Sequence, residues 1–106
     1  MRIVWTAGAV GDLARLHDFL AQVNVRAAAS VVQSLTAVGA RLLDHPRIGE
    51  KLDQYEPREV RRVLVDRYEV RYEVTATAIA ILRVWHTPTR PPAAAAPPPA
   101  PGQGAS

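Results

Sequence analysis

The chain has 106 residues, 48% of them hydrophobic, with no cysteine and a formal net charge of +3 at pH 7. This length suits one domain, and the lack of cysteine excludes disulfides and thiolate metal sites. No apolar run approaches the roughly 20 residues that span a bilayer, and the first ten residues are interrupted too soon for a signal peptide. We therefore expect a cytoplasmic protein with no membrane association.

Arginine supplies every basic residue except Lys51, and the sequence pI is near 10.0. The planar guanidinium of arginine binds carboxylate and phosphate groups through two parallel hydrogen bonds. Codon bias in a GC-rich genome explains such an excess equally well. The arginine content alone therefore does not decide between an acidic partner, a nucleic acid and neither.

The N-terminal part of the chain predicts a short strand and then a helix. Residues 2–5 are an apolar segment, and Thr6 is a suitable N-cap for a helix that begins directly after it. From about residue 7 to residue 23, apolar side chains recur at spacings of three and four, which is the period of a helix. These side chains are Val10, Leu13, Leu16 and Leu20.

A second helix is predicted from about residue 25 to residue 44, with Asn24 as its N-cap. The helix ends at His45-Pro46, because the residue before a proline leaves the helical region. Residues 47–58 contain Gly49 and Pro57 and are predicted to be a loop. The apolar stripe of this helix consists of Ala28, Val31, Val32, Leu35, Val38 and Leu42.

Three strands are predicted after the loop, at about residues 60–66, 69–75 and 79–85. The middle segment alternates strictly, which is typical of a half-buried antiparallel strand, and the short links favour antiparallel neighbours. The fold class is therefore α+β, with a helix hairpin packed on one face of a four-stranded, mainly antiparallel sheet. The other face would be open and would carry arginines. The alternating apolar positions are Tyr68, Val70, Tyr72 and Val74.

The C-terminal segment differs in composition from the rest of the chain. Residues 91–106 read PPAAAAPPPAPGQGAS, without a charge or a large apolar side chain. Proline blocks helix continuation and fixes an extended backbone, so this segment is predicted to be a disordered or polyproline-like tail. The folded unit is then about residues 1–90.

Few residues are suited to catalysis. Ser30 and Ser34 have no histidine nearby in sequence, and the three histidines lack metal-ligand spacing. No phosphate-binding glycine loop occurs, so neither a metal nor a cofactor is expected. His86 closes the last predicted strand and is followed by Arg90. Such a histidine is either a general acid or base, or a packing residue that fixes the end of the strand.

Several arginines lie in or beside the predicted strands. The alternation places Arg71 on one face with Glu69 and Glu73, whereas Arg62 shares a face with Leu64. These arginines either bind phosphate or an acidic segment, or form cross-strand pairs worth about 0.2–1 kcal/mol each. The nearby carboxylates would partly cancel a nucleic-acid-binding field. The strand arginines are Arg61, Arg62, Arg67, Arg71 and Arg83, and their acidic neighbours are Asp66, Glu69 and Glu73.

An ordered set of residues extends from the first predicted strand to the end of the last one. The set comprises Trp5, Ala9, Asp12, Leu13, Asn24, Pro46, Gly49, Arg58, the run VDRYEVRY from Val65 to Tyr72, Ile81 to Val84, and His86. In this order and at this length, residues 2–90 resemble the RelE/ParE superfamily of toxins from type II toxin–antitoxin modules. The resemblance implies the fold of that superfamily: an N-terminal strand, a helix hairpin and then three antiparallel strands.

The resemblance also implies a function and partners. A toxin of this kind is neutralised by a small antitoxin, usually encoded beside it, in a hetero-oligomer. RelE-like members bind in the ribosomal A site and cleave mRNA, using basic residues on the sheet and commonly a tyrosine near the C-terminus. ParE-like members act on DNA gyrase and are not known as nucleases.

The sequence departs from the ribonuclease branch in two places. Glu69 follows Tyr68 where that branch usually has an arginine, and no tyrosine follows the last strand. A carboxylate at this position opposes the stabilisation of phosphate charge. Arg62 does match a basic position of that branch, whereas His86 and Arg90 loosely match the ending of ParE-like members. We therefore expect a gyrase inhibitor rather than an enzyme; the alternatives are a ribosome-dependent mRNA endoribonuclease and a non-toxic binding module.

These interpretations give two sets of site residues. The candidates for toxicity or catalysis are His86, Arg62, Arg83 and Arg90. The expected antitoxin contacts are Arg62, Arg71 and Arg83, which would pair with antitoxin carboxylates, and Trp85, which would be an apolar anchor.

Overall fold

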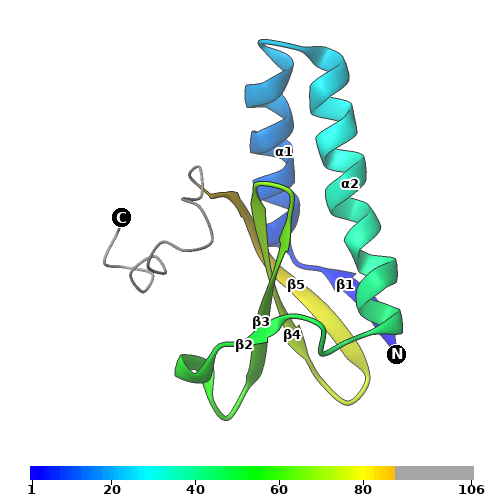
Figure 1. The fold of residues 1–106 in the computed structure, drawn as a ribbon, viewed down its shortest axis with the longest axis vertical. Coiled ribbons are helices and arrows are strands. Elements are labelled where there is room, and N and C mark those ends of the chain that lie inside the picture. Colours follow the sequence, from blue (N-terminus) through cyan, green and yellow to red (C-terminus); the bar gives the residue numbers. More distant parts are fainter. Residues whose placement is uncertain (88–106) are drawn as a thin grey trace, which may run out of the picture.

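The computed structural model describes residues 1–87, in which two helices pack on one face of a five-stranded sheet (Figure 1). The predicted α+β order of strand, helix hairpin and three strands is confirmed. The predicted tail at residues 91–106 and the candidate Arg90 lie outside the described residues. The elements are β1 (Arg2–Trp5), α1 (Ala7–Ala21), α2 (Val25–Asp44), β2 (Glu50–Lys51), the 3-10 helix η1 (Asp53–Tyr55), β3 (Glu59–Val65), β4 (Tyr68–Val74) and β5 (Ala78–His86).

Both helices begin at the caps that the sequence indicates. The Thr6 hydroxyl accepts a hydrogen bond from the Ala9 N–H at 3.3 Å, and the Asn24 side chain accepts one from the Ala27 N–H at 3.1 Å. α1 ends at Ala21, two residues before the predicted end. The reason is that Asn24 must adopt an extended backbone, with φ −158°, in order to cap α2, so the chain leaves the first helix early.

The strand order in the sheet is β1-β5-β4-β3-β2. β1 runs parallel to β5, and the other neighbours are antiparallel. Asp66, with φ 57°, makes the tight turn between β3 and β4; aspartate adopts this left-handed conformation more readily than most residues. A bulge at Leu82 shifts the register between β4 and β5. β2 corrects the prediction of a continuous loop: only two residues pair with β3, too few to show an alternating pattern.

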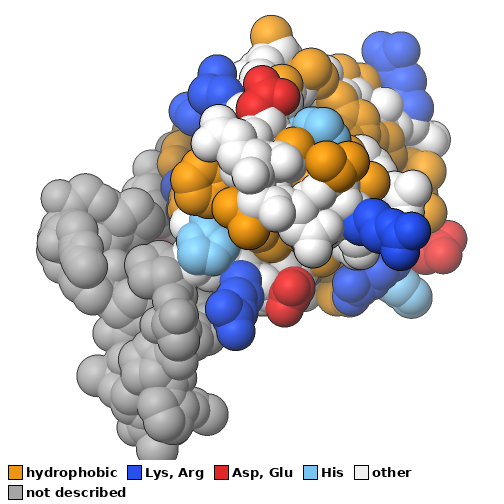
Figure 2. Space-filling model, turned by 90° about the horizontal axis from the view of Figure 1, so that it is seen from above, with side chains coloured by type: hydrophobic (Ala, Val, Ile, Leu, Met, Phe, Trp, Pro, Cys, Tyr) orange, Lys and Arg blue, Asp and Glu red, His pale blue; other side chains and the backbone are white. Residues whose placement is uncertain are grey.

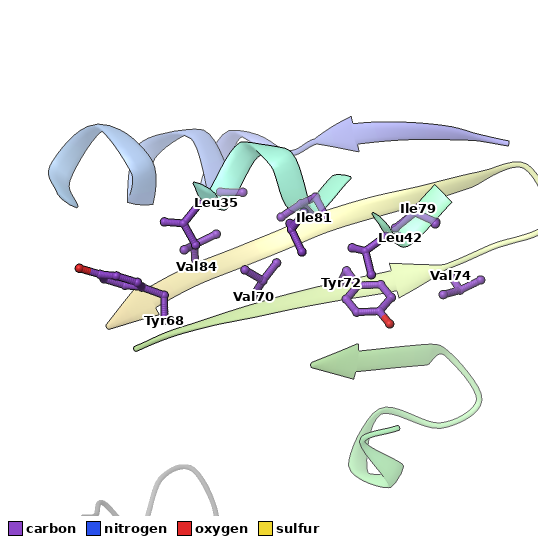
Figure 3. Close-up of a cluster of buried hydrophobic side chains, with 11 residues drawn as sticks. Leu35, Leu42, Tyr68, Val70, Tyr72, Val74, Ile79, Ile81 and Val84 are labelled. Carbon is purple, nitrogen blue, oxygen red and sulfur yellow. The ribbon is translucent and has the colours of Figure 1, made fainter. Parts of the chain in front are cut away.

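The main core lies between the helices and the sheet (Figure 3). The four alternating positions of β4 all face it, which confirms the predicted period of two. Each fully buried Val, Leu or Ile side chain stabilises the fold by about 1.5–3 kcal/mol. The core side chains include Leu35, Val38 and Leu42 from α2, Tyr68, Val70, Tyr72 and Val74 from β4, and Ile79, Ile81 and Val84 from β5.

Tyr72 connects this core to the loop that follows α2. Its hydroxyl accepts a hydrogen bond from the Gly49 N–H at 2.9 Å and donates one to the Pro46 carbonyl, also at 2.9 Å. A Cβ atom at Gly49 would lie 2.5 Å from the Arg62 carbonyl oxygen and 2.7 Å from the Tyr72 hydroxyl. Glycine at this position therefore allows the loop to approach the sheet closely.

The second face of the sheet is not fully open, contrary to the prediction. Val60 faces away from the helices, yet it is completely buried. Leu52, just before η1, is buried as well, and its N–H donates to the Val60 carbonyl at 2.8 Å. The segment from β2 to η1 therefore covers one end of this face, because β2 holds it against β3.

Candidate functional site

Three arginines occupy matching positions on neighbouring strands. The register places Arg62 of β3 opposite Arg71 of β4, and Arg71 opposite Arg83 of β5. Like charges directly opposite one another destabilise a sheet. Such a row is stable only if anions separate its members, and two carboxylates of the chain do so.

Asp12 on α1 binds Arg83, the last arginine of this row. The Arg83 guanidinium donates to its carboxylate from Nε at 2.8 Å and from Nη2 at 3.0 Å. The Val84 N–H donates to the same carboxylate at 2.8 Å, and Arg15 donates at 2.9 Å. Burial raises the pKa of Asp12, but these hydrogen bonds outweigh it and hold the pKa at about 2. β1 pairs with β5 only as far as Ile81, so no strand separates Arg83 from α1 and its side chain reaches Asp12 past the edge of β5.

Glu69 binds the other two arginines. Its carboxylate accepts a hydrogen bond from Arg71 Nη2 at 2.6 Å and lies 3.5 Å from Arg62 Nη1. The Glu69 and Arg71 side chains are both more than nine-tenths buried, whereas the Arg62 side chain is 26% exposed. Because this is a buried ion pair, the loss of either partner would leave an uncompensated charge inside the protein.

Two aromatic rings fix the position of Arg71. Its guanidinium carbon lies 4.7 Å from the centroid of the Trp85 ring and 5.8 Å from that of the Tyr55 ring. Arg71 Nη1 also donates to the Tyr55 hydroxyl at 2.9 Å. Its Nε is buried without a hydrogen-bond partner among the described residues. Cation–π contacts and hydrogen bonds therefore hold a guanidinium that still has one free donor.

Further ion pairs surround this cluster. Arg62 also donates to Glu50 at 2.9 Å, and Arg58 holds Glu73 at 2.8 Å. Of the cross-strand pairs that the sequence suggests, the one between Arg62 and Glu69 is present, whereas Glu73 pairs with Arg58, which precedes β3. Asp66 is exposed and forms no salt bridge within residues 1–87. Arg47 and Arg61 both pair with Glu59 at 2.8 Å.

The structure does not bring the predicted end-of-strand residues into one contact. His86 is exposed, and its ring forms a T-shaped contact with the Tyr68 ring at a centroid distance of 5.3 Å. Arg83 points to Asp12, and Arg90 lies outside the described residues. Within residues 1–87, no group of three potential metal ligands is present. None of the helices in this part of the chain is long and apolar enough to cross a membrane.

The end of the helix hairpin carries exposed apolar side chains that no pattern in the sequence marks. Phe19, Val23 and Val25 are 67%, 86% and 67% exposed. They lie where α1 passes into α2, and Figure 2 shows hydrophobic side chains with charged ones around them at this end of the molecule. Clustered exposed apolar side chains mark surfaces that contact other proteins.

Comparisons with known proteins give a consistent result. The family described as "ParE toxin of type II toxin-antitoxin system, parDE" matches residues 3–90. The chain is 31% identical over 85 residues to Toxin RelE2 of Caulobacter vibrioides, a match that covers 80% of this chain and 93% of that relative. Its fold is similar to a solved structure described as "Chromosomal ParDE TA system from P. aeruginosa", with a TM-score of 0.68 and 22% identity, covering 83% of this chain and 97% of the other.

Proposed function

Because this chain belongs to the ParE toxin family of type II toxin–antitoxin systems, we propose that it inhibits DNA gyrase and is neutralised by a cognate antitoxin. Membership of this family makes the chain the toxin component of such a system. Our proposal concerns its target, DNA gyrase. Inhibition of gyrase implies action in the cytoplasm, growth arrest, and no covalent chemistry by the toxin itself.

The observation that carries this choice is that the sheet arginines already hold carboxylates of the chain. Cleavage of mRNA needs cations that stabilise phosphate charge in the transition state, and a positioned acid or base. Arg62 and Arg71 share Glu69, and Arg83 holds Asp12. Because carboxylates of the chain already neutralise these arginines, they are poorly suited to stabilise phosphate charge during mRNA cleavage. This supports DNA gyrase as the target over the ribosome and mRNA. The competing candidate is a ribosome-dependent endoribonuclease, which the 31% identity to Toxin RelE2 favours.

We propose that the antitoxin wraps the sheet and the helices with a segment that becomes ordered on binding. The Arg83 and Arg62 side chains are 56% and 26% exposed, so both can accept a further carboxylate from the antitoxin. Half-buried Trp85 is the proposed apolar anchor. Arg71 was expected to pair with an antitoxin carboxylate, but it is buried and bound to Glu69, so we propose that it instead supports Trp85 by stacking on its ring. The exposed Phe19 extends the proposed contact to the helices. The product is a toxin–antitoxin hetero-oligomer.

The toxic surface is proposed at the end of β5, with His86, Arg83 and Arg90 as its residues. Replacement of Arg83 by alanine leaves the buried Asp12 carboxylate with two partners, the Val84 N–H and the Arg15 side chain, which is 71% exposed. Arg83→Ala and Arg90→Ala should therefore abolish toxicity and change thermal stability little. If His86 only fixes the strand end, His86→Ala should instead lower stability by about 1 kcal/mol. A fully toxic Arg83→Ala/Arg90→Ala variant would contradict this site.

Induced expression without antitoxin tests the target. Inhibition of gyrase predicts filamentous cells and a DNA-damage response before protein synthesis stops. Rapid arrest of translation with cuts in ribosome-bound mRNA would indicate the ribonuclease instead. Normal growth at a verified level of folded protein would indicate a non-toxic binding module. Co-expression with the neighbouring small reading frame tests the partner, since a cognate antitoxin should co-purify and restore growth.

A further inference from the structure

The arginine row at the centre of the sheet contains one pair of cations that face each other directly. Arg83 is bound to Asp12 of α1, which leaves Arg62 and Arg71 opposite each other on β3 and β4. Two opposed guanidinium groups repel, and they form a pair that accepts an oxyanion between them. The oxyanion in the structure is the carboxylate of Glu69, at 2.6 Å from Arg71 and 3.5 Å from Arg62.

We propose that Arg62 and Arg71 form an oxyanion-binding site that the chain fills with its own Glu69, and that this carboxylate keeps nucleic-acid phosphates off the sheet. Glu69 is thus a specificity-determining residue. The site has a buried side at Arg71 and a side near solvent at Arg62, whose side chain is 26% exposed. A phosphate oxygen would take the place of the carboxylate once the Glu69 side chain is removed.

The site is preorganised, because Arg71 is held by groups other than Glu69. Trp85 and Tyr55 flank its guanidinium, and the Tyr55 hydroxyl accepts one of its hydrogens. Its buried Nε has no partner within residues 1–87, so the guanidinium retains donor capacity. A site whose donors are fixed before the ligand arrives loses little freedom on binding.

Glu50 does not fill the site in the same way. It also pairs with Arg62, at 2.9 Å, but its side chain is 64% exposed. Solvent screens such a pair, and exposed ion pairs contribute little. Glu69, at 6% exposure, therefore determines whether this pair of arginines can accept an anion from solution.

Glu73 provides a matched control. It lies four residues after Glu69 on the same face of β4, because alternate residues of a strand point the same way, and its replacement removes the same charge. Its partner Arg58 is 53% exposed and lies outside the arginine row. A difference in anion binding between Glu69→Ala and Glu73→Ala would therefore arise from the Arg62–Arg71 site and not from the change in net charge.

The first experiment compares thermal unfolding in sodium phosphate and in sodium chloride at equal ionic strength. Phosphate should raise the Tm of Glu69→Ala by several degrees more than that of the wild type or of Glu73→Ala, because a ligand that binds only the folded state stabilises it. If Glu69→Ala does not fold in chloride, phosphate should restore folding. An equal phosphate effect in all three proteins, or a Glu69→Ala chain that stays unfolded in both salts, would overturn the proposal.

The second experiment measures the binding of a short single-stranded RNA as a function of salt. Glu69→Ala should bind more tightly than Glu73→Ala, and its log–log salt slope should be steeper by about 0.7, the value for one additional phosphate contact. Adding Arg71→Met to Glu69→Ala should remove this gain. Equal affinities and slopes for Glu69→Ala and Glu73→Ala would contradict the proposal.

This inference deepens the proposed function, since it gives a reason why the sheet would not bind nucleic acid. The two can fail separately. A wild-type protein that inhibits gyrase, with no gain of anion binding in Glu69→Ala, contradicts only the inference. A wild-type protein that cuts mRNA, with a clear gain in Glu69→Ala, contradicts only the proposed target.

Discussion

Arg83 on the last described strand binds Asp12 of the first helix across 71 residues of sequence, through hydrogen bonds of 2.8 and 3.0 Å. The same carboxylate accepts the Val84 N–H. β1 pairs with β5 only as far as Ile81, so beyond that point Asp12 supplies the acceptor that a further strand residue would have provided. One side chain thus completes the sheet edge and neutralises a strand arginine.

Asp12→Asn should change the acid limb of the stability curve. The folded-state pKa of Asp12, about 2, lies below its ordinary value of 3.8. The ionised Asp12 carboxylate therefore contributes about 2 kcal/mol to the free energy of unfolding above about pH 4, and this contribution is lost as the pH falls toward 2. Urea unfolding from pH 2 to pH 7 should show this loss in the wild type and not in Asp12→Asn.

The exposed Asp18 is the control for this measurement, since its side chain is 83% exposed. Asp18→Asn removes the same charge from α1 and should leave the acid limb unchanged. Identical pH profiles for the wild type and Asp12→Asn would show that the Asp12–Arg83 contact does not determine acid stability.

Tyr72→Phe should destabilise the protein by about 1–3 kcal/mol. The change removes the hydroxyl and leaves the buried Gly49 N–H without its acceptor. Tyr68→Phe is the matched control, because no hydrogen bond of the Tyr68 hydroxyl is present among the described residues. Chemical denaturation should show a lower free energy of unfolding for Tyr72→Phe than for Tyr68→Phe. Equal stability of the two variants would argue against a stabilising hydrogen bond between Tyr72 and the loop.

Much of the fold was predictable because its signals are local. The spacing of apolar residues, together with Thr6 and Asn24 as caps, predicts both helices, and the second agrees with the structure at both ends. Strict alternation predicts β4 and the face that it buries. β2 was not predictable, because its two residues become a strand only through pairing with Arg61 and Arg62 of β3.

The candidate site was less predictable because its contacts are distant in sequence. Asp12 lies 71 residues before Arg83 in the chain, and the register of Arg83 in the sheet depends on the bulge at Leu82. No local pattern marks that bulge. The pairing of Glu69 and Arg71 was within reach, since residues two apart on a strand share a face, whereas the stacking of Tyr55 depends on how η1 folds over the sheet.

Two glycines should respond in opposite directions to alanine. At Gly49 the new Cβ would lie 2.5 Å from the Arg62 carbonyl oxygen, so Gly49→Ala should cost about 1–3 kcal/mol. At Gly39, in the interior of α2, the nearest atom is Ile3 Cγ1 at 3.5 Å, an ordinary contact. Gly39→Ala should therefore stabilise the protein by about 0.5–1 kcal/mol. Thermal unfolding of the two variants measures both effects, and a stabilised Gly49→Ala would contradict the close approach.

Phe19→Ser tests the proposed antitoxin contact at the helix hairpin. Phe19 is 67% exposed, so the change should leave the Tm nearly unaltered. If the antitoxin covers this end of the hairpin, the affinity of the isolated toxin for it should fall by about tenfold or more, as measured by calorimetry. Ala29→Ser, on an exposed position of α2, is the control. Unchanged affinity in Phe19→Ser would restrict the proposed contact to the sheet.

Supercoiling by purified DNA gyrase, measured with the refolded toxin alone and with its antitoxin, tests the central proposal most directly. A gyrase inhibitor should block supercoiling in proportion to its concentration, and an equimolar amount of antitoxin should restore it. The parallel reaction, ribosomes programmed with a defined mRNA, should yield no toxin-dependent cuts. Unaffected supercoiling together with cuts in the ribosome-bound mRNA would contradict the gyrase target and establish the ribonuclease in its place.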